Sequence, residues 1–125
     1  MKKIILIGSE GVLGSYYKNI LSKNSNFFLV VGDKQFKTKT NLKVIQEKID
    51  LEKQQSILKF FKNLKSKYGD FDVLINNAAF TTEGTLKSKK KLTNKFEDFD
   101  FDIWKKTIDI NLTGAFLSCK YFIKY

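Results

Sequence analysis

The feature that most limits how this chain can fold is a short apolar run followed by three regularly spaced glycines. Residues 4–7 (Ile-Ile-Leu-Ile) have the composition of a buried strand, and Gly8, Gly11 and Gly14 follow at the start of a helical pattern. A pyrophosphate must come close to the backbone N–H groups at a helix N-terminus, and a Cβ atom there would obstruct it. The sequence therefore predicts a strand, a tight turn and a helix start that together bind a nucleotide cofactor.

This motif alone leaves an alternative open. The spacing is Gly-x-x-Gly-x-x-Gly rather than the Gly-x-Gly-x-x-Gly of the dinucleotide fingerprint, so a glycine turn without a ligand remains possible. A P-loop for nucleoside triphosphates is excluded, because no Gly-Lys-Ser or Gly-Lys-Thr follows.

The composition is typical of one small globular domain and excludes more than it indicates. Of the 125 residues 42% are hydrophobic, and the apolar run after Lys3 is too short for a signal peptide or a membrane span, so no membrane partner is expected. The single cysteine, Cys119, cannot form an internal disulfide, which fits a cytoplasmic protein. Histidine is absent, which removes imidazole chemistry and His-ligated metal, and we predict no metal site.

The net charge of +10 has an interpretation that does not involve function. All 23 basic residues are lysines, whereas the recognition of bases and phosphates usually depends on the bidentate fork of arginine. We therefore attribute the charge to solvent-exposed lysines from an AT-rich coding bias, and expect no nucleic-acid partner.

A second signal places an acidic residue at the same end of the predicted sheet as the glycines. Residues 11–23 have apolar side chains at helical spacing, and residues 27–31 are five consecutive apolar residues, typical of a strand covered on both faces. Strand, helix and strand form a right-handed βαβ unit, and Asp33 follows its second strand, where ligands bind in such sheets. Asp33 comes 19 residues after Gly14, close to where the dinucleotide fingerprint has an acid for the ribose hydroxyls.

The middle of the chain continues the alternation of strands and helices. Residues 43–49 alternate more than the first two strands, because Gln46, Glu47 and Lys48 interrupt the apolar positions, as in a half-exposed edge strand. Residues 52–68 form a predicted amphipathic helix that ends at Gly69, and residues 71–75 a fourth, buried strand. This alternation predicts an α/β fold with a doubly wound parallel sheet in the order 3-2-1-4, in which residues 43–49 lie at the outer edge.

The last third of the chain is predicted to contain a long loop and a helix. Residues 80–98 have no periodicity, and their lysine cluster, 87–91, is interpreted as a solvated loop, with binding of an anionic substrate such as a nucleotide sugar as the alternative. Apolar residues then follow helical spacing over 104–122, where Asn111 and Gly114 interrupt the pattern.

Five motifs in a fixed order now give the chain a resemblance to a known family. They are Gly8-x-x-Gly11-x-x-Gly14 after the first strand, Asp33 after the second, Asp50-Leu51 after the third, Leu74-Ile75-Asn76-Asn77-Ala78-Ala79 after the fourth, and Asn111-Leu112-Thr113-Gly114 in the last helix. Each motif is common, but the ordered set is not. On these residues the chain resembles the N-terminal half of a short-chain dehydrogenase/reductase. The resemblance implies that residues 1–125 are the N-terminal part of a single NAD(P)-binding Rossmann domain, whose C-terminal strands lie outside this sequence.

The resemblance also implies roles for individual residues. The glycines would cradle the pyrophosphate, Asp33 would hold the adenosine ribose, and the residues after the third and fourth strands would border the adenine and line the rest of the cofactor. Asn111 is implied as the catalytic-tetrad asparagine that anchors a water leading to the active-site lysine. The complete set implied for cofactor binding is Gly8, Ser9, Gly11, Val12, Leu13, Gly14, Asp33, Asp50, Leu51, Asn76, Asn77 and Ala78.

The sequence departs from the family pattern in two ways. The middle glycine comes one position earlier than in the compact branch, a spacing seen more in the extended, sugar-nucleotide-modifying branch, whereas the asparagine motifs favour the compact branch. The family's Ser and Tyr-x-x-x-Lys also lie a few tens of residues beyond the Asn111 position, past Tyr125. Tyr121 and Lys124 do not replace that pair, because their spacing is three and they lie in the helix whose apolar face packs on the sheet.

The implied function is hydride transfer between a nicotinamide coenzyme and a small-molecule carbonyl or alcohol, by a complete protein that forms a homo-oligomer. NAD is favoured over NADP because Asp33 accepts bonds from ribose hydroxyls and repels a 2′-phosphate, although Lys34 and Lys37 are cations that can hold a phosphate. The 125 residues alone are expected to be inactive and to self-associate, since an uncovered strand edge and helix face remain. The alternatives are a non-catalytic nucleotide-binding or scaffold protein and a sugar-nucleotide-modifying member of the same family.

Overall fold

One parallel sheet organises the computed structural model, which describes residues 1–37, 43–81 and 95–125. Its strands are β1 (Lys2–Ile7), β2 (Phe27–Asp33), β3 (Ile45–Lys48) and β4 (Val73–Asn76). Their order is β3-β2-β1-β4, which confirms the predicted Rossmann-like, doubly wound sheet with the third strand at the outer edge.

The strand register brings the carboxyl ends of β2, β1 and β4 to one line. Ile7, the last residue of β1, pairs with Gly32 of β2 on one side and with Asn76 of β4 on the other. The residues that follow these positions, including Gly8 and Asp33, therefore come out at the same edge of the sheet.

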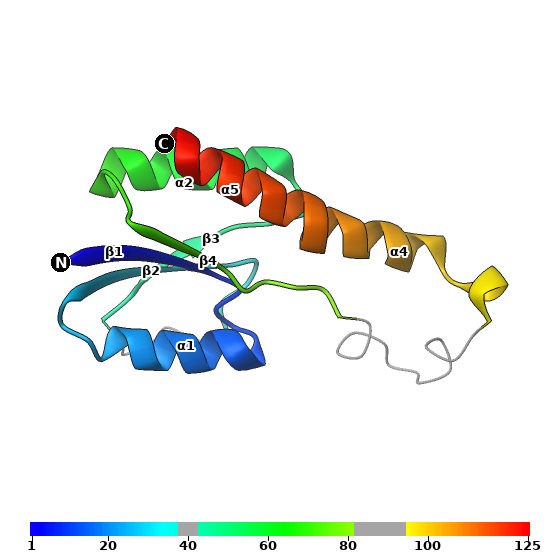
Figure 1. Ribbon diagram of the computed structural model, residues 1–125, viewed down its shortest axis with the longest axis horizontal. Coiled ribbons are helices and arrows are strands. Elements are labelled where there is room, and N and C mark those ends of the chain that lie inside the picture. Colours follow the sequence, from blue (N-terminus) through cyan, green and yellow to red (C-terminus); the bar gives the residue numbers. More distant parts are fainter. Residues whose placement is uncertain (38–42, 82–94) are drawn as a thin grey trace.

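Helices cover both faces of the sheet, which explains why its inner strands are apolar throughout. Helix α1 (Val12–Ser22) lies on one face, and α2 (Gln54–Tyr68) and α5 (Ala115–Lys124) lie side by side on the other (Figure 1). Between the sheet and α2 with α5 is a buried cluster that includes Ile5, Val30, Phe60 and Tyr121. A second cluster on the α1 face consists of Ile4, Leu6, Leu29 and Val31.

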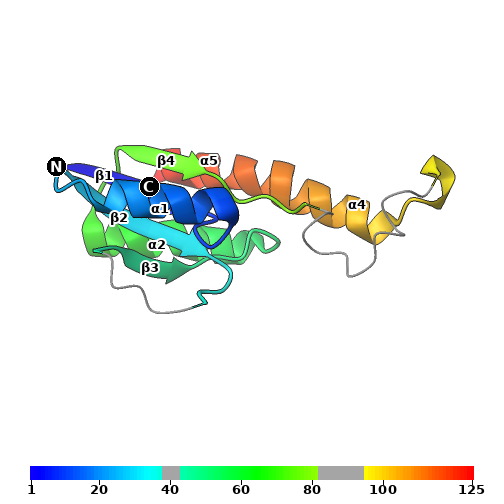
Figure 2. The same cartoon turned by 90° about the horizontal axis from the view of Figure 1, so that it is seen from below.

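The last helix is one long rod with a widened turn in its middle. It begins as α4 (Phe101–Ile108), where the Asp100 carboxylate accepts bonds from the N–H groups of Asp102 and Ile103. It continues through the π-helical turn η3 (Asp109–Gly114) into α5. The prediction of a helix interrupted at Asn111 and Gly114 is confirmed. Figure 2 shows that the α4 end of the rod extends beyond the sheet, toward the short 3-10 helix η2 (Phe96–Asp98).

Several element boundaries differ from the predictions, among them those of β3, β4 and α2. β3 is shorter than the predicted residues 43–49. β4 starts at Val73 rather than at residue 71. Before it, the Asp72 N–H donates to Lys3 O, and the Asp72 carboxylate, in place of a strand carbonyl, accepts from the Lys3 N–H. Helix α2 starts two residues late, because residues 50–53 form a turn in which the Lys53 N–H bonds to Asp50 O at 3.1 Å. At its other end, Gly69 caps the helix as predicted, with φ +75°.

The lysine cluster 87–91 lies outside the described residues. Within residues 1–37, 43–81 and 95–125, no helix has the length and apolar character needed to cross a lipid bilayer.

Candidate cofactor-binding cleft

A cleft of about 640 Å³ lies at the carboxyl ends of the strands and collects residues from every sequence motif except the last. Nine of the predicted cofactor-binding residues line it: Gly8, Gly11, Val12, Leu13, Asp33, Asp50, Leu51, Asn77 and Ala78. Its lining also includes residues that were not predicted, namely Glu10, Lys34, Gln35, Lys37, Ile49, Glu52, Ala79, Thr81, Ile110 and the end of β1. The predicted residues Ser9, Gly14, Asn76 and Asn111 do not belong to this lining.

A second, smaller cleft of about 400 Å³ contains none of the predicted residues. It lies between α2 and the end of α5, and Phe61, Phe71, Phe122 and Tyr125 contribute to its wall. Of these two clefts, only the larger one is lined by residues that the sequence predicted as cofactor-binding.

The three glycines differ in their surroundings, although the sequence motif predicts the same role for all of them. Gly8 has φ +87°, and a Cβ there would lie 2.5 Å from the backbone of Ala78. A Cβ on Gly14 would lie 1.9 Å from Gly8 O, so this glycine allows α1 to pack against the turn. Of the three, only Gly11 has room for a Cβ, which would make an ordinary contact with Gly8 O at 3.8 Å. Gly8 and Gly14 thus shape the turn, while steric demand does not require a glycine at position 11.

The N-terminus of α1 offers backbone donors at the cleft. Gly11 is the N-cap residue, and among the described side chains none caps this end of the helix. The first N–H groups of a helix have no partner within it, and together with the helix dipole they favour an anion. The following residue, Val12, is 90% exposed, so access to these donors from solvent is open.

Asp33 presents a carboxylate that the backbone holds in place. Its Oδ2 accepts a hydrogen bond from the Glu10 N–H at 2.9 Å, and its Oδ1 accepts one from the Lys34 N–H at 2.8 Å. These bonds join the end of β2 to the glycine-rich turn after β1, and they fix the carboxylate at the cleft.

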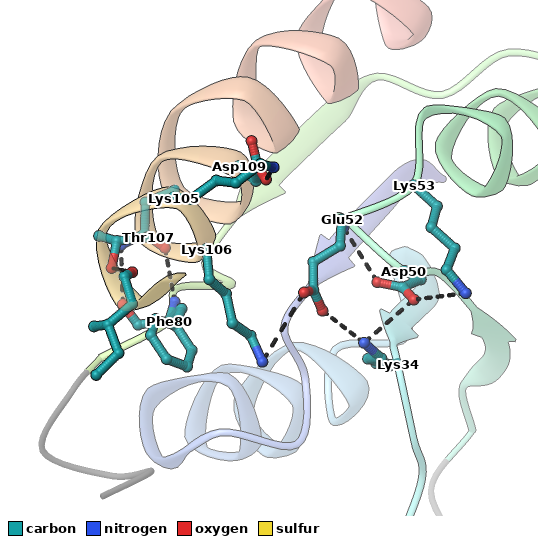
Figure 3. Close-up of polar contacts among 11 residues, drawn as sticks. Lys34, Asp50, Glu52, Lys53, Phe80, Lys105, Lys106, Thr107 and Asp109 are labelled. Atoms are coloured by element: carbon teal, nitrogen blue, oxygen red, sulfur yellow. Dashed lines mark hydrogen bonds and ion pairs between the residues drawn. The ribbon is translucent and has the colours of Figure 1, made fainter. Parts of the chain in front are cut away.

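A chain of ion pairs connects three residues of the cleft lining, Lys34, Asp50 and Glu52, with helix α4 (Figure 3). Lys34 Nζ lies 2.6 Å from Glu52 Oε2 and 3.2 Å from Asp50 Oδ2, and Glu52 Oε1 lies 3.9 Å from Lys106 Nζ on α4. The hydrogen bond to Glu52, opposed by partial burial and supported by Asp50, raises the pKa of Lys34 above its ordinary value. The Lys34 ammonium is therefore already engaged by two carboxylates.

The two asparagines after β4 point to different places. Asn77 Nδ2 donates to Gly8 O at 2.9 Å, and the Asn77 N–H donates to Ile7 O, so this residue ties the end of β4 to the glycine turn. Asn76 Nδ2 instead reaches Cys119 Sγ on α5 at 3.3 Å. The alternation of side chains along a strand explains the split, since adjacent residues face opposite sides of a sheet.

Asn111 lies in the π-helical turn, and its side chain forms hydrogen bonds with the segment that follows β4. Its Oδ1 accepts from the Phe80 N–H at 2.7 Å, and its Nδ2 donates to Phe80 O at 3.0 Å. The widened turn also brings Gly114 against Leu51, where a Cβ would lie 2.9 Å from the Leu51 Cβ. Although Asn111 is not in the cleft lining, its neighbour Ile110 is.

Tyr121, part of the rejected Tyr-Lys pair, is buried between helices. Its hydroxyl accepts a hydrogen bond from Gln54 Nε2 at 3.0 Å, and Lys124 Nζ lies over the Tyr125 ring. Neither Tyr121 nor Lys124 belongs to the lining of the larger cleft.

Glu10 is one of the cleft residues that could not be predicted from the sequence. It occupies a variable position inside the glycine motif, and its partner Lys18 is eight residues away, outside the i,i+3 and i,i+4 spacings that reveal helical ion pairs. Across the described ranges no group of three or more acidic or cysteine side chains is placed to hold a metal ion.

Comparison with known proteins identifies the family of this chain. A family model described as short chain dehydrogenase matches residues 2–125. Trans-4-hydroxycyclohexanecarboxylate dehydrogenase of Sinomonas cyclohexanicum is 43% identical over 54 residues, which are 43% of this chain and 17% of that protein. An uncharacterized oxidoreductase of Staphylococcus saprophyticus is 26% identical over 124 residues, which cover 91% of this chain and 45% of the relative.

The fold is also similar to that of solved structures. Alcohol dehydrogenase from the archaeon Thermococcus sibiricus, solved in complex with 5-hydroxy-NADP, has a TM-score of 0.80 at 19% identity, and the match covers 99% of this chain and 52% of that chain. The chain thus spans about half the length, or less, of these three proteins. Because the family model matches almost the whole chain, the chain belongs to the short-chain dehydrogenase family.

Proposed function

We propose that this protein binds a nicotinamide dinucleotide in the larger cleft and takes part in hydride transfer between the nicotinamide and a small-molecule carbonyl or alcohol. One observation carries the proposal: Gly11, Asp33, Asp50 and Asn77 come from four separate segments, yet all line one cleft at the carboxyl ends of the strands.

The residues present fit a dinucleotide. The open space at Gly11 and the uncapped start of α1 suit a pyrophosphate, because backbone donors there can approach an anion closely. The fixed carboxylate of Asp33 suits ribose hydroxyls, which donate hydrogen bonds. Asp50 and Leu51, which follow the neighbouring strand, would border the adenine.

The charges favour NAD over NADP. A 2′-phosphate beside Asp33 would meet a like charge, and two unit charges about 4 Å apart repel by about 4 kcal/mol at an effective dielectric constant of 20. Lys34 offers little compensation, because Asp50 and Glu52 already bind its ammonium.

When bound, the nicotinamide would supply or accept the hydride. Asn111 would then act as a positioning residue, because its side chain holds the backbone of Phe80 at the end of the cleft that adjoins β4. The name of the Sinomonas relative, a dehydrogenase of a hydroxy acid, supports an alcohol or carbonyl as the substrate class.

The proposal is tested by titrating the full-length protein with NADH and with NADPH and following the nicotinamide fluorescence. We expect saturable binding of both, tighter for NADH, and turnover of an alcohol or ketone from a substrate panel. Binding without turnover on any such compound would favour a non-catalytic nucleotide-binding protein. Absence of dinucleotide binding would refute the proposal.

A further inference from the structure

Lys106, on α4, contacts two segments that both contribute to the wall of the larger cleft. Its Nζ lies 3.9 Å from Glu52 Oε1, in the turn that follows β3, and 4.9 Å from the centre of the Phe80 ring, in the segment that follows β4 (Figure 3). Glu52 lines the cleft itself, and Phe80 stands between two lining residues, Ala79 and Thr81. Lys106 is not among the described lining residues. One ammonium group therefore connects two parts of the cleft wall without lining the cleft.

The same side of the last helix makes further contacts with this wall. Ile110, one helical turn after Lys106, lines the cleft, and Asn111 bonds to both backbone groups of Phe80. The segment after β4 is thus attached to the helix through its backbone. Lys106 adds an attachment for the turn after β3, by way of the Glu52 side chain.

Glu52 passes this attachment on to other charged groups of the cleft. Its Oε2 lies 2.6 Å from Lys34 Nζ, and its N–H donates to Asp50 Oδ1 at 3.1 Å. Lys34 Nζ in turn lies 3.2 Å from Asp50 Oδ2. Lys34, Asp50 and Glu52 all line the cleft, so a displacement of Glu52 would shift three charged groups of its wall.

We propose that Lys106 is a positioning residue that, through Glu52, holds the turn after β3 against the cleft and so slows the release of the bound dinucleotide. The proposal rests on the proposed binding of a nicotinamide dinucleotide in this cleft. A ligand bordered by such a turn leaves when the turn moves outward. Outward movement would separate Glu52 from Lys106, and the loss of this contact raises the barrier to release.

The neighbouring lysine provides a matched control. Lys105 also lies on α4, but its Nζ pairs with the Asp109 carboxylate one turn further along the same helix (Figure 3). Lys105→Met therefore removes the same charge from the same helix and keeps the contact between Lys106 and Glu52.

The experiment measures how fast NADH leaves the full-length protein. The complex is mixed with excess NAD in a stopped-flow instrument, and the loss of nicotinamide fluorescence is followed. We expect Lys106→Met to release NADH about threefold faster, which is the effect expected from one partly exposed ion pair. Lys105→Met should leave the release rate unchanged. Lys106→Arg should restore slow release, because a guanidinium can pair with a carboxylate and lie over an aromatic ring.

Two further measurements separate this role from a general effect of charge or stability. A lysine that only attracts the anionic coenzyme changes the association rate, and there Lys105→Met and Lys106→Met should behave alike. In the background of Glu52→Gln, Lys106→Met should no longer accelerate release. Raising the salt concentration from about 0.05 to 0.5 M should accelerate release from the wild-type protein more than from Lys106→Met, because salt screens the exposed pair.

The possible outcomes separate the two proposals. An unchanged release rate in Lys106→Met, or an equal acceleration in Lys105→Met, would overturn the role of Lys106 while the proposed function stands. If the wild-type protein binds no dinucleotide, the proposed function fails and this inference fails with it. If Glu52→Gln does not fold, Lys106→Arg decides alone: slow release supports the ion pair, and fast release contradicts it.

Discussion

The side chain of Asn111 bonds to both backbone groups of Phe80, accepting from its N–H at 2.7 Å and donating to its carbonyl at 3.0 Å. The two residues are 31 positions apart in the sequence, and their contact joins the π-helical turn to the segment after β4. The ring of Phe80 in turn lies under Lys106 Nζ, 4.9 Å from the ring centre (Figure 3). One asparagine thus fixes the end of the cleft that adjoins β4.

Replacing Asn111 tests this pair of hydrogen bonds. Asn111→Ala should lower the free energy of unfolding by about 1 to 2 kcal/mol, the net value of two hydrogen bonds. It should also remove the protection of the Phe80 amide from hydrogen exchange, as measured by NMR or mass spectrometry. Asn111→Asp should keep that protection, since its carboxylate still accepts from the Phe80 N–H, but should lose the bond to the Phe80 carbonyl.

The matched control is Asn63→Ala, on the exposed side of α2. Its effect on stability should stay within about 0.5 kcal/mol. The interpretation of Asn111 as a positioning residue is wrong if Asn111→Ala leaves the exchange of the Phe80 amide unchanged.

Substitution of Gly14 should affect stability, whereas substitution of Gly11 should affect coenzyme binding. Gly14→Ala would place a Cβ 1.9 Å from Gly8 O, and we expect it to destabilise the protein by about 3 kcal/mol or more in urea unfolding. Gly11→Ala meets nothing nearer than 3.8 Å, so its stability should change by less than about 1 kcal/mol, while its NADH affinity should fall about tenfold. Equal effects of the two substitutions on stability would contradict the division of tasks.

The Glu10–Lys18 pair should make stability depend on pH in the acid range. The pKa of Glu10 is lowered by folding, so its contribution is fully present above the unfolded-state pKa of a glutamate, about 4.3, and is lost as pH falls through the lower folded-state value. Glu10→Gln should therefore be less stable than wild type by about 1 kcal/mol at pH 7, and the difference should shrink below about pH 4. Thermal unfolding at several pH values measures this, and a difference independent of pH would exclude the charge as its cause.

The 125-residue chain by itself should self-associate. Leu112, Phe116 and Ile123 are 63%, 64% and 84% exposed, which is unusual for large apolar side chains, and the helical period places them near one face of the last helix. Sedimentation equilibrium should detect dimers or larger species at micromolar concentration. The double variant Phe116→Lys/Ile123→Lys should associate less strongly. The control variant Lys59→Ala, on α2, should associate as the unaltered chain does. A monomer with sharp, dispersed amide signals would contradict this expectation.

The fold could be predicted from the sequence because its signals are local. Residues 4–7 and 27–31 are apolar without interruption because helices cover both faces of the inner strands, whereas the strand at residues 45–48 is mostly polar because it is the edge. Gly69 marked the end of α2 because its φ of +75° favours glycine. The boundaries were less accurate, since the turn at residues 50–53 depends on contacts that a periodic pattern does not contain.

The site was only partly predictable, for a physical reason. A motif identifies which residues occur together, but the direction of each side chain depends on the packing of the whole sheet. Asn76 and Asn77 look alike in the sequence, yet Asn77 bonds to the glycine turn and Asn76 to Cys119. Likewise nothing in the sequence relates Glu10 to Lys18, because their contact depends on how the turn enters α1.

The most direct test of the account is the coenzyme selectivity of Asp33→Asn, which keeps the shape of the side chain and removes its charge. The measurement is the ratio of the NADPH to the NADH dissociation constant in the full-length protein, beside Asp33→Ala and wild type. The account predicts weaker NADH binding and a ratio at least tenfold lower than that of wild type in both variants. Unchanged affinity for both coenzymes in both variants would contradict it.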